Sequence, residues 1–377
     1  MKTLILTCNT GEGHNSTASA VKDVFDAHGE ICDRADTLAF LSPLISRFIC
    51  HAHARIYRYI PKAFSVGYRA AEEHPNAFKR KSLLYRLLTR GAKKLYRHVI
   101  DGSYDTIVCT HAFSAVLATG LTEKYPELDV YTAFVATDYT CSPSVRESRM
   151  DVFFIPDASL TEEFTSKDIP ADRIVPVGIP VRAPFLTRTL RESACASCGL
   201  PQDKRQLLLM CGSMGCGPME ELAQCLSDDM PQDVIVTVIC GTNKELERRL
   251  SRRFADRENV RVLGYVTNVP ELMDCTDLYL TKPGGISVTE AAAKGLPMVL
   301  VNAVAGCEEY NLRYNIGYGM AKTADTPQEL SALCAALLSD SDALEHMKEQ
   351  IALHAHNDAA ERIFEHLYDV NKAKTGE

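Results

Sequence analysis

Residues 278–290 read LYLTKPGGISVTE, and this stretch is the clearest sign of the fold. Its first four residues form a short apolar run, which is typical of a strand covered by helices on both faces. A glycine-rich turn follows at residues 282–285, and a helical stretch begins near Ser287, so we expect Glu290 in its first turn. A strand that passes through a glycine turn into a helix is the repeating unit of parallel α/β domains.

The same pattern occurs in both halves of the chain. The first half starts with a strand at residues 3–8, the turn Gly11-Glu12-Gly13-His14 and a helix at 16–27. Short apolar runs predict further strands at 106–109, 130–136, 152–155 and 174–177. The second half has such runs at 206–211, 234–239, 261–263, 278–281 and 297–301. This alternation predicts an α/β protein with two Rossmann-like, doubly wound domains that face a cleft.

Prolines mark the boundary between the halves. Pro180, Pro184 and Pro201 interrupt regular structure there. We therefore expect an N-terminal domain over residues 1–180, a linker over 181–204 and a C-terminal domain over 205–355. The apolar periodicity of residues 359–370 predicts a final helix within 356–377, which we expect to pack back on the N-terminal domain.

Composition excludes several classes of protein. The chain has 377 residues, of which 46% are hydrophobic and 24% charged, as in a globular protein of two domains. Its 41 basic and 49 acidic residues give a net charge of −8, so no nucleic-acid partner is expected. No apolar run reaches the roughly 18 residues of a membrane span. We expect a cytoplasmic location, because the N-terminus does not read as a signal peptide and the 14 cysteines are scattered like reduced thiols.

One cysteine pair has the spacing of a metal motif. Cys195 and Cys198 form a CxxC, but a zinc site usually needs a second ligand pair at similar spacing. The sequence shows no such second pair. We therefore expect no bound metal.

Two glycine turns in the second half could bind phosphate. Residues 212–217 and 282–285 each follow a strand of the same predicted sheet, and the carboxyl ends of parallel strands meet at one edge. Backbone N–H groups and helix N-termini at such an edge could hold a diphosphate. Each turn alone could equally be a tight strand–helix connection. Glu290 could either favour the helix dipole or accept hydrogen bonds from a ribose diol.

The glycine turn of the first half carries an ionisable side chain. Ser16 stands where a dinucleotide motif needs its third glycine, which argues against nicotinamide or flavin binding. His14 lies at the start of the predicted helix. It could be a capping or solvated histidine, or a neutral imidazole that acts as a base near pH 7.

A basic strip reverses the acidic charge of the chain locally. Residues 79–97 contain no acidic residue and eight basic ones, which are Lys79, Arg80, Lys81, Arg86, Arg90, Lys93, Lys94 and Arg97. On a helix, Leu84, Leu87, Leu88, Leu95 and Val99 would share one face. Such a helix could lie in the headgroup layer of an anionic membrane, with help from apolar and aromatic residues between 45 and 64. The alternative is a core helix with a solvated basic face.

Several segments together resemble glycosyltransferase family 28, and within it the diacylglycerol sugar transferases. They are GEGH at 11–14, THAF at 110–113, TDY at 137–139, GIPV at 178–181, GYVTN at 264–268, KPGG at 282–285 with Thr289-Glu290, and GCEEYN at 306–311. The resemblance implies a GT-B fold and an inverting, metal-independent transfer of a hexose from a UDP-sugar. The acceptor would be a lipid hydroxyl, with diacylglycerol expected first, and no cofactor would be needed.

The resemblance also implies roles for individual residues. The UDP-sugar donor is expected at Gly212, Ser213, Val266, Gly284, Gly285, Ser287, Thr289, Glu290, Glu308 and Asn311. Among these, Val266 would hold the uracil, Glu290 the ribose, and Glu308 with Asn311 the sugar. Gly11 and Gly13 would form the loop beside the acceptor.

His14 would take the proton of the acceptor hydroxyl, because a neutral imidazole suits that task near pH 7. Asp138 is the alternative base, or the carboxylate that orients His14. The C-terminal domain would then bind the donor. The N-terminal domain would bind the acceptor and the anionic inner face of the cell membrane, as a peripheral protein.

Two departures from the family pattern leave the substrates open. Cys307 replaces the family's glutamine, and a thiol is a poor hydrogen-bond partner for sugar hydroxyls. The histidine and tryptophan that commonly follow the TDY segment are missing, and the chain contains no tryptophan. Three alternatives therefore stay open: a UDP-GlcNAc-type transferase acting on a cell-wall lipid intermediate, a nucleotide-sugar epimerase, and a non-catalytic sensor of sugar nucleotides or lipids.

Overall fold

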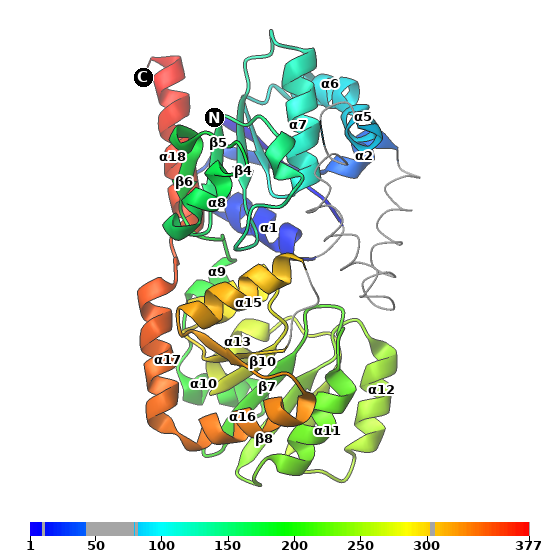
Figure 1. Cartoon of the computed structure of the whole chain (residues 1–377), viewed down its shortest axis with the longest axis vertical. Helices are drawn as coiled ribbons and strands as arrows, with labels where there is room; N and C mark the ends of the chain where they lie inside the picture. Colours follow the sequence, from blue (N-terminus) through cyan, green and yellow to red (C-terminus); the bar gives the residue numbers. More distant parts are fainter. Residues whose placement is uncertain (10–11, 43–78, 80–81, 302–305, 377) are drawn as a thin grey trace. The chain divides into compact units, whose positions relative to one another are not determined.

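The computed structural model describes residues 1–9, 12–42, 79, 82–301 and 306–376. Within this part of the chain, contacts group the residues into two compact units (Figure 1). The first unit contains the described residues of 1–182, 305–307 and 356–377, and the second contains those of 183–304 and 308–355. Each unit is built around its own six-stranded parallel sheet.

The sheet of the first unit has the strand order β2-β1-β3-β4-β5-β6. Its strands are β1 (Lys2–Thr7), β2 (Ile31–Asp36), β3 (Thr106–Cys109), β4 (Tyr131–Val135), β5 (Val152–Ile155) and β6 (Ile174–Pro176). The helices are α1 (Glu12–Ala27), α2 (Thr37–Leu41), α5 (Leu83–Thr89), α6 (Ala92–Gly102), α7 (Ala112–Lys124), α8 (Thr161–Thr165) and α18 (Ala359–Thr375). Short 3₁₀ turns lie at Val145–Glu147, Ala158–Leu160 and Ala171–Arg173.

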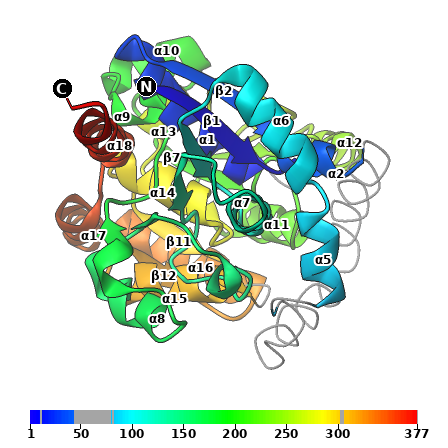
Figure 2. The same cartoon turned by 90° about the horizontal axis from the view of Figure 1, so that it is seen from above.

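Successive residues of these strands point to opposite faces of the sheet, so each strand feeds two apolar cores. In β1, Leu4 and Leu6 pack with side chains of α6 and α7, whereas Ile5 packs with α1 and α18. Figure 2 shows α5, α6 and α7 on one side of β1 and α18 on the other. The C-terminal helix therefore covers the first unit, beside α1, although the chain reaches it only after the second unit.

The sheet of the second unit has the strand order β12-β11-β10-β7-β8-β9. Its strands are β7 (Arg205–Met210), β8 (Val234–Ile239), β9 (Val260–Leu263), β10 (Leu278–Thr281), β11 (Met298–Leu300) and β12 (Ala321–Thr323). The helices are α9 (Ala183–Leu186), α10 (Arg191–Cys198), α11 (Met219–Asp229), α12 (Lys244–Arg253), α13 (Val269–Cys275), α14 (Gly285–Ala293), α15 (Cys307–Gly317), α16 (Pro327–Ser339) and α17 (Ser341–His354).

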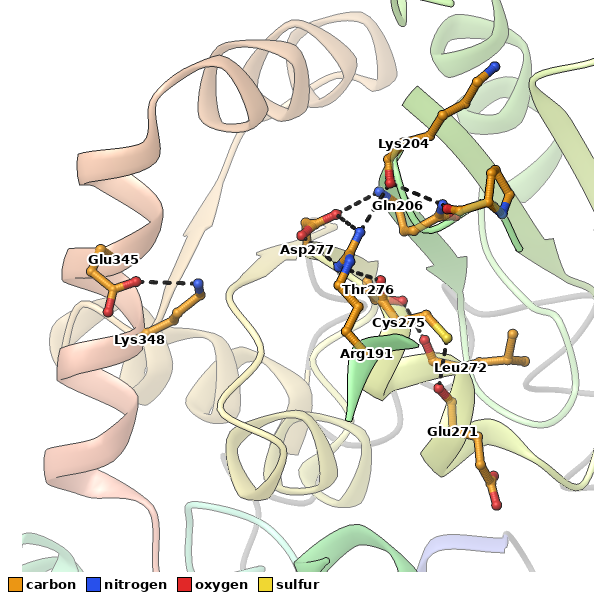
Figure 3. A network of polar contacts seen from close by, with 11 residues as sticks. Arg191, Lys204, Gln206, Glu271, Leu272, Cys275, Thr276, Asp277, Glu345 and Lys348 are labelled. Carbon is orange, nitrogen blue, oxygen red and sulfur yellow. Dashed lines mark hydrogen bonds and ion pairs between the residues drawn. The ribbon is translucent and has the colours of Figure 1, made fainter. Parts of the chain in front are cut away.

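The segment predicted as a linker, 181–204, contains α9 and α10 and lies almost entirely in the second unit. The Arg191 guanidinium makes two hydrogen bonds to the Asp277 carboxylate, at 2.9 and 3.0 Å, and the Gln206 N–H donates to the same carboxylate at 2.7 Å (Figure 3). This network ties the start of α10 to the beginnings of β7 and β10. The prolines mark breaks between short helices here, and the segment is folded.

The sequence patterns predict the central strands and miss two edge strands. β3, β5, β8 and β10 have the predicted bounds, because each is a continuous apolar run. β2 and β12 lie at the edges of their sheets. They read ICDRAD and AKT, and these polar strands have no apolar run that could predict them.

Candidate active site

The carboxyl edge of the first sheet brings His14 against the end of a second strand. The chain goes from β1 to β2 on one side and returns to β3 on the other, so the order of the strands reverses between β1 and β3. Such reversals leave room for ligands at the carboxyl edge of open α/β sheets. His14 is the third residue of α1 after β1, and its Nδ1 lies 2.8 Å from the carbonyl oxygen of Thr110, just after β3. The Thr110 hydroxyl donates in return to the His14 carbonyl at 3.2 Å.

These contacts define the tautomer of the neutral His14 ring. A carbonyl oxygen only accepts hydrogen bonds, so Nδ1 carries the proton and Nε2 holds the lone pair. The Thr137 hydroxyl, which follows β4, lies 3.1 Å from the same Nδ1. Partial burial lowers the pKa of His14, and the Thr110 hydrogen bond opposes this shift to a smaller extent. The ring is therefore neutral at pH 7, and its Nε2 is able to accept a proton. The half-buried ring contacts the residues that follow β3 and β4.

A second histidine, which the sequence analysis quoted only as part of a motif, lies beside His14. The ring of His111 meets that of His14 edge to face, with ring centroids 4.5 Å apart. The Nδ1 of His111 accepts the Phe113 N–H at 3.0 Å and caps α7. Because Nδ1 accepts, the neutral His111 ring carries its proton on Nε2. The motif after β3 could have flagged His111, but its contact with His14 depends on the strand order.

Three further residues were predicted at this edge of the first sheet: Asp138, Gly11 and Gly13. Asp138 is half-buried and directly follows Thr137. Thr110 and Thr137 contact Nδ1 of His14, and the role of Asp138 as the alternative base or as the carboxylate that orients His14 stays a prediction. Gly13 is half-buried in the first turn of α1, and Gly11 lies outside the described residues.

The second sheet brings its two glycine turns together. Its strand order reverses between the neighbouring strands β7 and β10, which pair from Leu207–Leu278 to Met210–Thr281. The turns that begin at Gly212 and Lys282 therefore leave the sheet side by side. Gly215 has a φ of 55°, and a Cβ at this position would lie 2.2 Å from the Cys240 carbonyl oxygen. Glycine is required there because the backbone passes so close to the end of β8.

The side chain of Lys282 lies where these two turns meet. Its Nζ is 2.7 Å from Oε1 of Glu308, in the first turn of α15. Gly212 has a φ of 70°, and a Cβ there would lie 3.0 Å from Cε of Lys282. The sequence predicts the turns and Glu308 but not the role of the lysine, because the direction of its side chain depends on the strand pairing.

Two predicted donor residues hold the turn together from within. Asn311 is fully buried, and its amide donates to the Pro283 carbonyl at 3.0 Å. The Thr289 hydroxyl donates to the Gly285 carbonyl at 2.7 Å. Their side chains fix the shape of the 282–285 turn, which is the part of the site that would contact a phosphate.

Glu290 lies in a different part of its helix from the predicted one. Helix α14 begins at Gly285, two residues earlier than expected, so Glu290 falls in the second turn. The prediction of a first-turn position was wrong, because the sequence placed the helix start after the glycines. The dipole effect is confined to the first turn, so it no longer explains this buried carboxylate.

The other predicted donor residues lie at or near the carboxyl ends of strands. Ser213 follows Gly212 after β7, Val266 follows β9, and Gly284, Gly285 and Ser287 form the end of the turn and the start of α14. Ser213, Val266 and Ser287 are half-buried. Free N–H groups at the start of a helix such as α14 can donate hydrogen bonds to an anionic ligand.

The CxxC pair lies in the interior of the second unit. Cys195 and Cys198 are buried on α10, which packs on α13, and burial raises the pKa of Cys275 at the end of α13. Throughout the described residues, no three His, Cys, Asp or Glu side chains are grouped so that they could hold a metal ion. The buried side chains of Cys195 and Cys198 pack in the interior as small apolar groups do.

The basic strip forms two helices, α5 and α6, instead of one. Its apolar side is buried: Leu88, Leu95 and Val99 pack against the protein core. For these three residues the structure agrees with the alternative of a core helix, because α7 and the sheet cover them. The basic side is exposed at Lys79, Arg86, Arg90, Lys93, Lys94 and Arg97, whereas Arg80, Lys81 and the stretch 45–64 lie outside the described residues. No helix in the described ranges is both long and apolar enough to span a bilayer.

In a comparison with known proteins, each unit matches a family model that is named for sugar transfer. Residues 14–181 match the family model described as monogalactosyldiacylglycerol (MGDG) synthase, and residues 221–354 match that of glycosyl transferases group 1. A processive diacylglycerol beta-glucosyltransferase of Staphylococcus carnosus is 28% identical over 355 residues, which are 93% of this chain and 88% of that protein. Over most of its length the chain is similar to this diacylglycerol beta-glucosyltransferase. The resemblance inferred from the sequence motifs is thus confirmed.

Solved structures show the same fold for this chain. MurG of Acinetobacter baumannii superimposes with a TM-score of 0.64 at 14% identity, covering 98% of this chain and 99% of MurG. A putative UDP-N-acetylglucosamine 2-epimerase of Listeria monocytogenes gives a TM-score of 0.65 at 13% identity, covering 100% and 98%. The predicted GT-B fold is confirmed. At such low identity the likeness concerns the fold alone.

Proposed function

We propose that this chain transfers a hexose from a UDP-sugar to the hydroxyl group of diacylglycerol, with inversion at the anomeric carbon and without a metal ion or other cofactor. The observation that carries the proposal is the similarity to a diacylglycerol beta-glucosyltransferase over 93% of the chain. The donor would bind at the glycine turns of the second unit, and the acceptor at the His14 edge of the first.

In the proposed step, the acceptor oxygen attacks C1 of the sugar on the face opposite to UDP. The bond between that oxygen and C1 forms while the bond from C1 to the diphosphate oxygen breaks, and its electron pair leaves with UDP. Nε2 of His14 takes the hydroxyl proton. The geometry supports this role, because the Thr110 carbonyl holds the proton of the ring on Nδ1 and leaves the Nε2 lone pair to react.

The donor half of the proposal rests on the second sheet edge. The diphosphate would bind the N–H groups at the start of α14 and the turn of residues 212–217, where a developing negative charge is stabilised electrostatically. Val266 would contact the uracil, the buried carboxylate of Glu290 the ribose, and Glu308 the sugar. Asn311 and Thr289 would act through the turn that they hold.

Measurement of UDP release tests this function. The purified protein is incubated with UDP-glucose, UDP-galactose or UDP-GlcNAc, with and without diacylglycerol in vesicles. We expect UDP release that requires the lipid, together with a lipid product heavier by one sugar. Equal release without diacylglycerol would refute transfer to lipid, and tight UDP binding without any release would indicate a non-catalytic sensor.

We further propose that the exposed side of α5 and α6 docks the enzyme on the anionic inner face of the cell membrane as a peripheral protein. A basic residue near such a surface contributes about 1 kcal/mol, which is about a fivefold change in binding. We expect that replacing Arg86, Arg90, Lys93, Lys94 and Arg97 with glutamine abolishes flotation with anionic vesicles.

The matched control for docking replaces Lys244, Arg248, Arg249, Arg252 and Arg253, which are also exposed but lie on α12. Two of these arginines already pair with Glu220. Both variants lose the same charge, so equal loss of flotation would show that only net charge matters and would refute a dedicated docking face.

A further inference from the structure

The ion pair between Lys282 and Glu308 lies at the glycine turn after β10, where the donor is proposed to bind. The lysine is the first residue of the turn after β10, and Nζ lies 2.7 Å from the glutamate Oε1. The lysine side chain is 21% exposed and that of the glutamate 11% exposed. Both groups thus lie at the carboxyl edge of the sheet, mostly but not completely withdrawn from water.

The neighbouring glycines show where the ammonium group points. A Cβ built on Gly212 or on Gly284 would lie 3.9 Å from Nζ of Lys282 in each case. The charge is therefore equally close to the turn after β7 and to the turn after β10. A diphosphate bound at both turns would meet this ammonium group.

Stability alone does not account for the pair. The cost of removing two charges from water usually offsets most of their attraction, so a partly buried ion pair adds little to folding. A cation stabilises a ligand that brings a negative charge on each phosphate, and a lysine ammonium has three donors that can serve two acceptors at once.

We propose that Lys282 binds the diphosphate of the UDP-sugar and at the same time holds Glu308 in position for a hydroxyl group of the sugar. This inference rests on the proposed function and adds a residue that couples recognition of the diphosphate to recognition of the sugar. Lys282 is then a binding residue for UDP. Glu308 contributes only when a sugar is attached.

Calorimetric titrations with UDP and with UDP-glucose separate these roles. For Lys282→Gln we expect UDP affinity at least tenfold weaker, because a charge-assisted contact is lost. For Glu308→Gln we expect UDP affinity within about threefold of wild type. The preference for UDP-glucose over UDP should shrink in both variants. Lys282→Arg keeps the charge and should recover most of the UDP affinity, whereas Lys322→Gln, a change at an exposed lysine of β12, should have no effect.

The outcomes are distinguishable. A wild-type protein that binds UDP together with a folded Lys282→Gln variant that binds it equally well would overturn the inference while leaving the proposed function intact. A wild-type protein that binds no UDP would refute the proposed function itself. If Lys282→Gln does not fold, Lys282→Arg and Glu308→Gln decide: the inference fails if Glu308→Gln loses UDP and UDP-glucose binding equally.

Discussion

Replacement of His14 by asparagine should separate its chemistry from its structural contacts. The amide of asparagine can donate to the Thr110 carbonyl in place of Nδ1–H, but it offers no basic nitrogen in place of Nε2. The variant therefore keeps the hydrogen bond at the carboxyl edge of the first sheet and loses the basic nitrogen. Alanine at the same position would remove both the base and the hydrogen bond.

A general base contributes about 10²–10⁴ to the rate, which is about 3–5 kcal/mol of transition-state stabilisation. We therefore expect turnover of His14→Asn to fall by about a hundredfold or more, and His14→Ala to fall at least as far. UDP affinity should stay unchanged in both, because the donor residues belong to the other unit. Alanine should also lower the free energy of unfolding by about 1–3 kcal/mol, since the Thr110 carbonyl loses its partner.

The pH profile gives a second readout of the same residue. Burial lowers the pKa of His14 below 6.5, so the neutral, active form is present above that pKa and is lost as the pH falls through it. We expect kcat/KM of the wild type to rise with pH on the acidic side and to be level near pH 7. The acidic limb should be absent from His14→Asn.

The assay is UDP release with diacylglycerol vesicles over a pH series, with His346→Ala as the control. His346 is an exposed histidine of α17 and its replacement should leave the profile unchanged. Turnover of His14→Asn within threefold of wild type, or an acidic limb that persists in it, would remove His14 from the mechanism.

Three further predictions concern stability and binding. Gly212→Ala and Gly199→Ala both place alanine at a positive φ (70° and 63°), so each should lower the free energy of unfolding in urea by about 1–2 kcal/mol. Only Gly212→Ala, which crowds Lys282, should also weaken UDP binding. Equal UDP affinity in the two variants would contradict the placement of the lysine. Lys294→Met leaves the carboxylate of Asp274 buried without its cation and should lower the free energy of unfolding by about 3–5 kcal/mol. Lys348→Met, at the exposed pair with Glu345 in Figure 3, should lower it by less than about 1 kcal/mol. Similar losses in the two variants would count against the buried pair. Because the pKa of His14 is lowered on folding, the wild type should lose stability faster than His14→Asn as the pH falls below about 6.5, and parallel curves would contradict the burial of the ring.

The sequence predicts the central strands and the glycine turns because their causes are local. A continuous apolar run such as 234–239 marks a strand covered on both faces, and the structure has β8 at these residues. Polar edge strands such as β2 lack this pattern, because one side of an edge strand is open to water. The start of α14 was placed too late because glycine is a poor helix former, yet it is tolerated in the first turn.

The side chains that complete the site depend on pairing between distant strands. His111 reaches His14 only because β3 pairs with β1, and Lys282 reaches Gly212 only because β10 pairs with β7. Neither pairing can be read from local spacing. The sequence likewise left open whether the apolar face of α5 and α6 lies in the core or on lipid, because the contacts of these helices with α7 depend on the tertiary fold.

The most direct test of the account is the structure of the reaction product. Purified protein is given an α-linked UDP-hexose and diacylglycerol, and the lipid product is analysed by mass spectrometry and by NMR of the anomeric proton. The account predicts one hexose joined to the free glycerol hydroxyl in the β configuration. An α-linked product would contradict the single inverting displacement with His14 as base, and free hexose as the only product would contradict lipid glycosyl transfer altogether.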